Sequence, residues 1–91
     1  MAAVNYQSVF FSGHVQGVGF RYSALQVAKE FEVAGWVTNV ADGRVQIEVE
    51  GRAEEVEAFI AAVAERMHGH VRKIERSGGS RPAQCSGFLI K

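Results

Sequence analysis

The chain has 91 residues, of which 47% are hydrophobic and 22% are charged, a composition typical of one globular domain over residues 1–91 and not of a disordered segment. Ten basic residues balance ten acidic ones, so no net charge draws the chain to nucleic acid or to an anionic membrane. The one cysteine, Cys85, excludes an intrachain disulfide and a cysteine-rich zinc site. No apolar run is long enough to span a membrane and the first residues lack a signal-peptide pattern, so we expect a cytoplasmic protein.

The first half of the chain predicts a strand, a helix and a second strand. Residues 4–12 are rich in β-branched and aromatic side chains, and their consecutive apolar residues favour a strand inside the sheet. Residues 20–32 carry apolar side chains at helical spacing along one face. Residues 35–40 then predict a short strand, with Gly35 as a turn and Trp36 as a core residue.

The second half predicts a hairpin, a helix and two further strands. The Asp42–Gly43 pair is a hairpin turn signal, and residues 44–50 after it alternate strictly between apolar and polar. Residues 53–67 predict the second helix, because their apolar side chains recur at helical spacing along one face and glutamates lie near the helix start. A weaker strand is expected over 70–77, a loop over 78–84 and a short strand over 87–90. The expected dry face of the central strand holds Val45, Ile47 and Val49, and its expected solvated face holds Gln46, Glu48 and Glu50.

The order strand, helix, strand, strand, helix, strand indicates the ferredoxin-like βαββαβ arrangement. This is an α+β two-layer sandwich, in which an antiparallel sheet carries both helices on one face, here with a short C-terminal strand added. Right-handed crossovers place the first strand inside the sheet and the loop that follows it at one end.

That loop, within the segment GHVQGVGFR, has the composition of a phosphate site. The start of a helix exposes N–H groups without partners and is partly positive, so it stabilises an anion. Gly17 and Gly19 allow the backbone to curl its N–H groups around a ligand, and the guanidinium of Arg21 can bind two phosphate oxygens. No acidic residue lies from Gly13 to Tyr22, and the glycine patterns of nucleotide sites are absent. A plain glycine-rich turn is the alternative that composition leaves open.

The segments GHVQGVGFR and GWVTNVADGRVQIEVEG together resemble the acylphosphatase family, which hydrolyses carboxyl–phosphate anhydrides, over nearly the whole chain. The resemblance implies the ferredoxin-like fold, no metal or organic cofactor, and a small acyl phosphate as substrate. It implies that Arg21 and Asn39 are catalytic, with Asn39 positioning the attacking water. It also implies a loop that binds phosphate or sulfate in a monomeric protein with no nucleic-acid or membrane partner. The implied phosphate-binding residues are Val15, Gln16, Gly17, Val18, Gly19, Phe20 and Arg21.

Two other functions compete with this interpretation. The first is a non-catalytic, acylphosphatase-like module that binds phosphate or carbamoyl phosphate. The second is an RNA-binding module, which would need exposed aromatic and basic residues on the sheet, where this chain places acidic ones. The histidines offer no better site: His14 is expected to point away from the loop, and His68 and His70 have no third metal ligand nearby.

Overall fold

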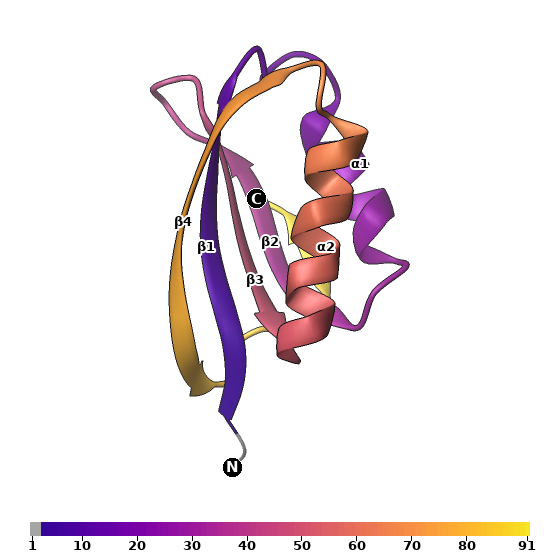
Figure 1. The fold of residues 1–91 in the computed structure, drawn as a ribbon, viewed down its shortest axis with the longest axis vertical. Coiled ribbons are helices and arrows are strands. Elements are labelled where there is room, and N and C mark those ends of the chain that lie inside the picture. Colours follow the sequence, from indigo (N-terminus) through magenta and orange to yellow (C-terminus); the bar gives the residue numbers. More distant parts are fainter. Residues whose placement is uncertain (1–2) are drawn as a thin grey trace.

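The computed structural model describes residues 3–91, which form five strands and two helices. Both helices cover the same face of a single sheet (Figure 1). The expected two-layer α+β sandwich is therefore confirmed, with a fifth strand at its C-terminal end. The strands are β1 (Ala3–Gly13), β2 (Val33–Asn39), β3 (Val45–Gly51), β4 (Val71–Pro82) and β5 (Phe88–Ile90), and the helices are α1 (Phe20–Ala28) and α2 (Ala53–Arg66).

The strands lie in the order β4-β1-β3-β2-β5, which places β1 inside the sheet as expected. β1 pairs antiparallel with both β3 and β4, and β2 pairs antiparallel with β3. β5 instead pairs in parallel with β2, so the complete sheet is mixed. After β4 the chain crosses from one edge of the sheet to the other, and β5 then runs along β2 in the same direction.

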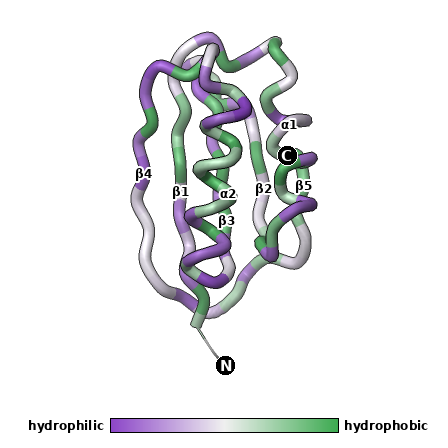
Figure 2. Tube along the Cα trace, turned by 45° about the vertical axis from the view of Figure 1, so that its right-hand side comes forward, coloured by the Kyte–Doolittle hydropathy of each residue, from purple (hydrophilic) through white to green (hydrophobic). Residues whose placement is uncertain are grey.

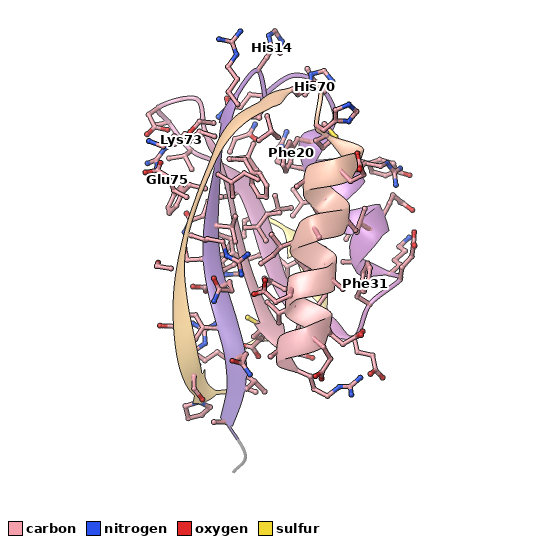
Figure 3. All side chains as sticks on the ribbon, in the orientation of Figure 1. His14, Phe20, Phe31, His70, Lys73 and Glu75 are labelled. Carbon is pink, nitrogen blue, oxygen red and sulfur yellow. The ribbon has the colours of Figure 1, made fainter. Side chains whose placement is uncertain are left out.

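The core fills the space between the helices and the sheet. Every second residue of β3 is buried there, in agreement with the alternation of its sequence, and so is the apolar stripe of α2. Phe20 points into this layer (Figure 3), where its ring lies 4.9 Å from that of Phe11. The outermost strand β4 is mostly hydrophilic or neutral (Figure 2), as suits an edge strand with little core contact.

The expected solvated face of β3 is not fully solvated. Glu50 is only 3% exposed, because the segment after β4 folds across it. The Glu50 carboxylate accepts hydrogen bonds from the Arg81 guanidinium at 3.0 Å and from the backbone N–H groups of Gln84 and Cys85, each at 3.0 Å. The prediction that this face of β3 is solvated was therefore wrong at Glu50, because a segment distant in the sequence covers that side chain.

Trp36 and Gly35 also differ from expectation. Trp36 is half-buried on the face opposite the helices, where the Lys91 ammonium lies 4.3 Å from the ring centroid, so it is not a core residue. Gly35 is no turn: it lies within β2, and a Cβ there would collide with the backbone oxygen of Glu48. Close approach of two strand backbones is the reason for a glycine at this position.

The expected loop over 78–84 is wrong for its first five residues, which extend β4 as far as Pro82. They pair with residues 3–7, the first part of β1. β1 pairs with β3 on its other side, so this extension of β4 gives residues 5–7 a partner on both sides. Glycine, serine and proline are tolerated there because β4 is an edge strand.

Helix α1 ends at Ala28, earlier than expected. Neither helix within residues 3–91 is long and apolar enough to cross a membrane.

Candidate active site

The loop between β1 and α1, residues 14–19, lies at the end of the sheet away from the N-terminus (Figure 1). Buried side chains hold it from below, since Val15 is 1% exposed and Phe20, directly after it, is 2% exposed. The backbone N–H of His14 donates to the carbonyl of His70 at 3.0 Å, which fixes the start of the loop to the residue that precedes β4. The β1–α1 loop therefore has a fixed base although it contains no regular structure.

Gly17 and Gly19 give this loop its curvature. Both have φ of +77°, and Gly19 is the N-cap residue of α1. A Cβ at either position would meet nothing within 4 Å, so backbone conformation and not lack of space favours glycine here. The prediction that these glycines adopt positive φ is confirmed.

The loop presents a row of backbone donors. Within residues 3–91, no N–H group of residues 15–22 donates to a protein acceptor, and the first helical bond runs from the Ser23 N–H to the Gly19 carbonyl at 2.9 Å. The first turn of α1 contains no acidic residue. Unpaired N–H groups and the positive end of the helix dipole therefore coincide, which is the local condition for binding an anion.

A cavity of about 250 Å³ lies against this loop, and we call it the loop cavity. Arg21 contributes to it from the first turn of α1. Asn39 contributes from the far end of β2, where it pairs with Val45 of β3. The structure thus brings the two predicted catalytic residues to one cavity, although their elements are separate in the sequence. The lining residues are Val15, Gly17, Gly19, Phe20, Arg21, Tyr22, Asn39 and Ile90.

Arg21 is available to an external anion. It forms no ion pair within residues 3–91, whereas Arg44, Arg52, Arg76 and Arg81 each pair with a carboxylate. Among the described residues 3–91, no Asp or Glu lines the loop cavity. The cavity therefore holds one guanidinium without a negative partner, which suits a phosphoryl group.

The nearby β2–β3 turn keeps its own charges paired. Arg44 binds Asp42 at 2.8 Å. The hydrogen bond from the Arg44 backbone N–H is the main cause that lowers the pKa of Asp42, and the Arg44 side chain adds to it. Asp42 is therefore an ion-pair partner of Arg44, and neither residue lines the loop cavity to which Arg21 contributes.

The Gln16 side chain makes a contact that the sequence analysis did not predict. Its amide donates to the carbonyl of Val40 at 2.8 Å and to that of Arg44 at 2.9 Å. Both carbonyls belong to the turn that follows Asn39, so Gln16 ties the loop to the segment that carries Asn39. Val18 also points elsewhere, because it packs against the core. Among residues 3–91, Gln16 and Val18 are the two predicted phosphate-binding residues that do not line the loop cavity.

The histidines lie outside the loop cavity. His14 and His70 sit at the tip of the molecule (Figure 3), and their ring centroids are 6.3 Å apart. The expectation that His14 points away from the loop is confirmed, since it is exposed and does not line the cavity. Within residues 3–91 no group of three or more His, Cys, Asp or Glu side chains could hold a metal ion.

Two lining residues were missed by sequence reasoning, Tyr22 and Ile90. Tyr22 follows Arg21 directly, and an exposed aromatic residue beside a predicted phosphate-binding arginine is a signal that could have been used. Ile90 could not have been placed, because its position depends on which edge of the sheet receives β5.

Several known proteins are similar to this chain along most of its length. The family model for acylphosphatase matches residues 7–90. An acylphosphatase from Roseiflexus sp. is 49% identical over 83 residues, which cover 90% of this chain and 89% of the relative. One from Methanospirillum hungatei is 40% identical over 65 residues, 71% of each chain. The crystal structure of acylphosphatase from Bacillus subtilis matches with a TM-score of 0.83 and 32% identity, over 97% of this chain and 98% of that one. With its fold, its loop and these relatives in agreement, the chain belongs to the acylphosphatase family.

Proposed function

We propose that this protein hydrolyses the carboxyl–phosphate bond of small acyl phosphates to a carboxylate and inorganic phosphate, with no metal or organic cofactor. The observation that carries the proposal is the meeting of unpaired loop N–H groups, Arg21 and Asn39 at one cavity. Membership of the acylphosphatase family supports the same reaction.

The β1–α1 loop and Arg21 bind the phosphoryl group. The N–H groups of residues 15–20 point their partial positive charge at its oxygens, and the Arg21 guanidinium binds two of them at once. Because buried Val15 and Phe20 hold the loop in place before substrate arrives, these donors need little reorganisation as charge builds up on the phosphoryl oxygens. The same donors bind free phosphate or sulfate.

Asn39 positions the attacking water. Its side-chain oxygen accepts a hydrogen bond from the water, and its amino group remains free to donate. The water oxygen forms a bond to phosphorus while the bond from phosphorus to the carboxylate oxygen breaks, and the carboxylate leaves as an anion. The proton of the water passes to the phosphate product or to solvent, since no His, Asp, Glu or Lys in the described part of the chain lines the loop cavity. An acyl phosphate is already activated, so positioning and charge stabilisation suffice.

The wider setting of the enzyme belongs to the same proposal. We expect a monomeric, cytoplasmic protein with a single domain over residues 1–91 and no nucleic-acid or membrane partner. The balance of ten basic and ten acidic residues supports the last point.

The test is hydrolysis of acetyl phosphate in the presence of EDTA. Arg21→Ala and Asn39→Ala should each lower kcat/KM by about 10²-fold or more, the scale for loss of one preorganised transition-state contact. Arg66→Ala and Arg72→Ala are matched controls, because both arginines are exposed, lack ion pairs within residues 3–91 and do not line the cavity. A wild-type protein no faster than buffer would reject the enzyme in favour of a phosphate- or carbamoyl-phosphate-binding module.

A further inference from the structure

We infer that His14 and His70 together form a binding site for a divalent transition-metal ion that prefers nitrogen ligands, such as Ni²⁺, Cu²⁺ or Zn²⁺. Both side chains are exposed at the tip of the molecule (Figure 3), and their ring centroids are 6.3 Å apart. Neither residue lines the loop cavity, so the inference goes beyond the proposed function and does not depend on it.

Close backbone contacts hold the two histidines beside each other. The His14 N–H donates to the His70 carbonyl at 3.0 Å, and the His70 N–H donates to the Met67 carbonyl at 2.9 Å, just after α2. Gly13 makes this approach possible, because it has φ of +130° and a Cβ at its position would collide with the His70 carbonyl oxygen. The end of β1 and the turn before β4 therefore meet at a fixed point, and each carries one imidazole there.

Both imidazoles are free to bind a ligand. Within residues 3–91, neither ring takes part in a hydrogen bond or an ion pair. The Nδ1 atom of His68, by contrast, lies 3.1 Å from the Glu65 carbonyl oxygen and 3.6 Å from the Glu65 carboxylate. A neutral imidazole has one nitrogen with a free lone pair, which is a common metal ligand. His14 and His70 can therefore each supply one nitrogen without breaking an existing contact.

The separation of the two rings suits a shared metal ion. With metal–nitrogen distances of about 2.0–2.1 Å, two imidazoles on one tetrahedral ion have their centroids about 5 Å apart. The observed separation of 6.3 Å is slightly longer. Because both side chains are exposed and the backbones that carry them are fixed, a small rotation of the rings closes the difference without moving the chain.

The donor set decides which ions the site takes. Imidazole nitrogen favours late first-row ions, whereas Mg²⁺ and Ca²⁺ prefer oxygen ligands. Two protein ligands leave the other coordination positions to water, so the ion is exchangeable and unlike a closed structural zinc centre. The Arg72 side chain passes close to Gly13, and its positive charge opposes a bound cation, so the two imidazoles supply the affinity.

Metal binding at this site is coupled to folding. His14 follows the first strand and His70 precedes the fourth, so only the folded chain brings the two imidazoles together. An ion held by both side chains binds the folded state in preference to the unfolded chain and raises the stability of the protein.

The experiment titrates Ni²⁺ into the untagged protein by isothermal titration calorimetry, for the wild type, His14→Ala and His70→Ala. The wild type should bind one Ni²⁺ ion, and each variant should bind it about 10²-fold more weakly, the low end of the gain from linking two ligands. Ni²⁺ should also raise the Tm of the wild type but not that of either variant. Mg²⁺ should produce neither effect.

Two matched controls separate this site from general metal binding. His68→Ala removes the third histidine, which is exposed on the same turn but faces Glu65, and it should keep the wild-type affinity. Arg72→Ala removes a neighbouring side chain that is no ligand, and it should bind Ni²⁺ at least as tightly as the wild type. In EDTA the Tm of every variant should lie close to that of the wild type, since alanine keeps the backbone contacts.

Three results would reject the metal site. The wild type binds Ni²⁺ no better than a variant that lacks both His14 and His70, or His68→Ala weakens binding as much as the other two substitutions. The third is a loss in only one of His14→Ala and His70→Ala, because a single imidazole then holds the ion. Hydrolysis of acetyl phosphate in EDTA tests the proposed function separately, since no metal is present in that assay.

Discussion

Replacing Glu50 with glutamine should destabilise this protein by about 3 kcal/mol, the low end of the range for breaking a buried ion pair. Glu50 is 3% exposed, and Arg81, its partner at 3.0 Å, has a side chain that is 15% exposed. The carboxylate also accepts the backbone N–H groups of Gln84 and Cys85, which lie in the segment between β4 and β5. It therefore fixes the crossing that brings β5 to its place beside β2.

The magnitude follows from what each group would lose. Glutamine keeps one oxygen, which can still accept a backbone N–H, but it has no charge to offer the guanidinium. Arg81 would then remain largely covered against the Tyr6 ring, and Glu48, at 3.5 Å, would be its one remaining carboxylate partner within residues 3–91. Its Nε already lacks a hydrogen-bond partner within residues 3–91. Leaving a buried charge without its partner costs about 3–5 kcal/mol, and the retained backbone bond favours the lower figure.

The assay is thermal unfolding of the wild type and the variant. For a domain of this size each kcal/mol shifts Tm by about 4–8 °C, so Glu50→Gln should lower Tm by about 12 °C or more. Glu48→Gln is the matched control, since Glu48 also contacts Arg81 but is 22% exposed and more distant. A loosely held, partly exposed pair of this kind contributes about 0–1 kcal/mol.

The dependence of this difference on pH gives a second check. Burial raises the pKa of Glu50, but the hydrogen bonds from the Cys85 N–H, the Arg81 side chain and the Gln84 N–H outweigh it, so the pKa lies below the ordinary 4.5. A lowered folded-state pKa means that the ionised carboxylate stabilises the folded state fully above the unfolded pKa. The advantage of the wild type over Glu50→Gln should therefore be complete at neutral pH and shrink as pH falls below 4.5. Equal losses in the Glu48 and Glu50 variants, or a difference that ignores pH, would refute this reasoning.

Two further predictions concern activity. Gln16→Ala should lower kcat/KM for acetyl phosphate by about tenfold, because a loosened Asn39 segment misplaces the water. Gln16→Glu cannot donate to the carbonyls of Val40 and Arg44 and should lose as much activity. A Gln16→Glu enzyme with wild-type kcat/KM would contradict the positioning role of these two hydrogen bonds. Turnover should change little between about pH 5 and 8, the range in which histidine titrates, because none of the histidines within residues 3–91 lines the loop cavity. A steep pH–rate profile that follows a single group in this range would show that a protein base takes part.

Local patterns in the sequence were enough to predict most of the secondary structure and the part of the candidate site that the β1–α1 loop and Arg21 contribute. The alternation over 44–50 and the stripe over 53–67 depend on neighbours a few residues apart, and both β3 and α2 form where these patterns lie. The loop glycines and Arg21 are also close in the sequence, so the anion-binding end of α1 could be inferred directly. Their positive φ and unpaired N–H groups agree with that inference.

Long-range contacts, by contrast, were decided only in the folded chain. Alternation predicts that Glu50 points away from the helices, but not that residues 81–85 bury it. For Trp36 the prediction of a core position was wrong, because the side chain lies half-exposed on the face opposite the helices. The hydrogen bonds from Gln16 to the β2–β3 turn and the position of Ile90 at the loop cavity also depend on contacts between segments that are distant in the sequence. Local sequence determines which way a side chain points. What the side chain contacts depends on where a distant part of the chain packs, and residue periodicity does not encode that position.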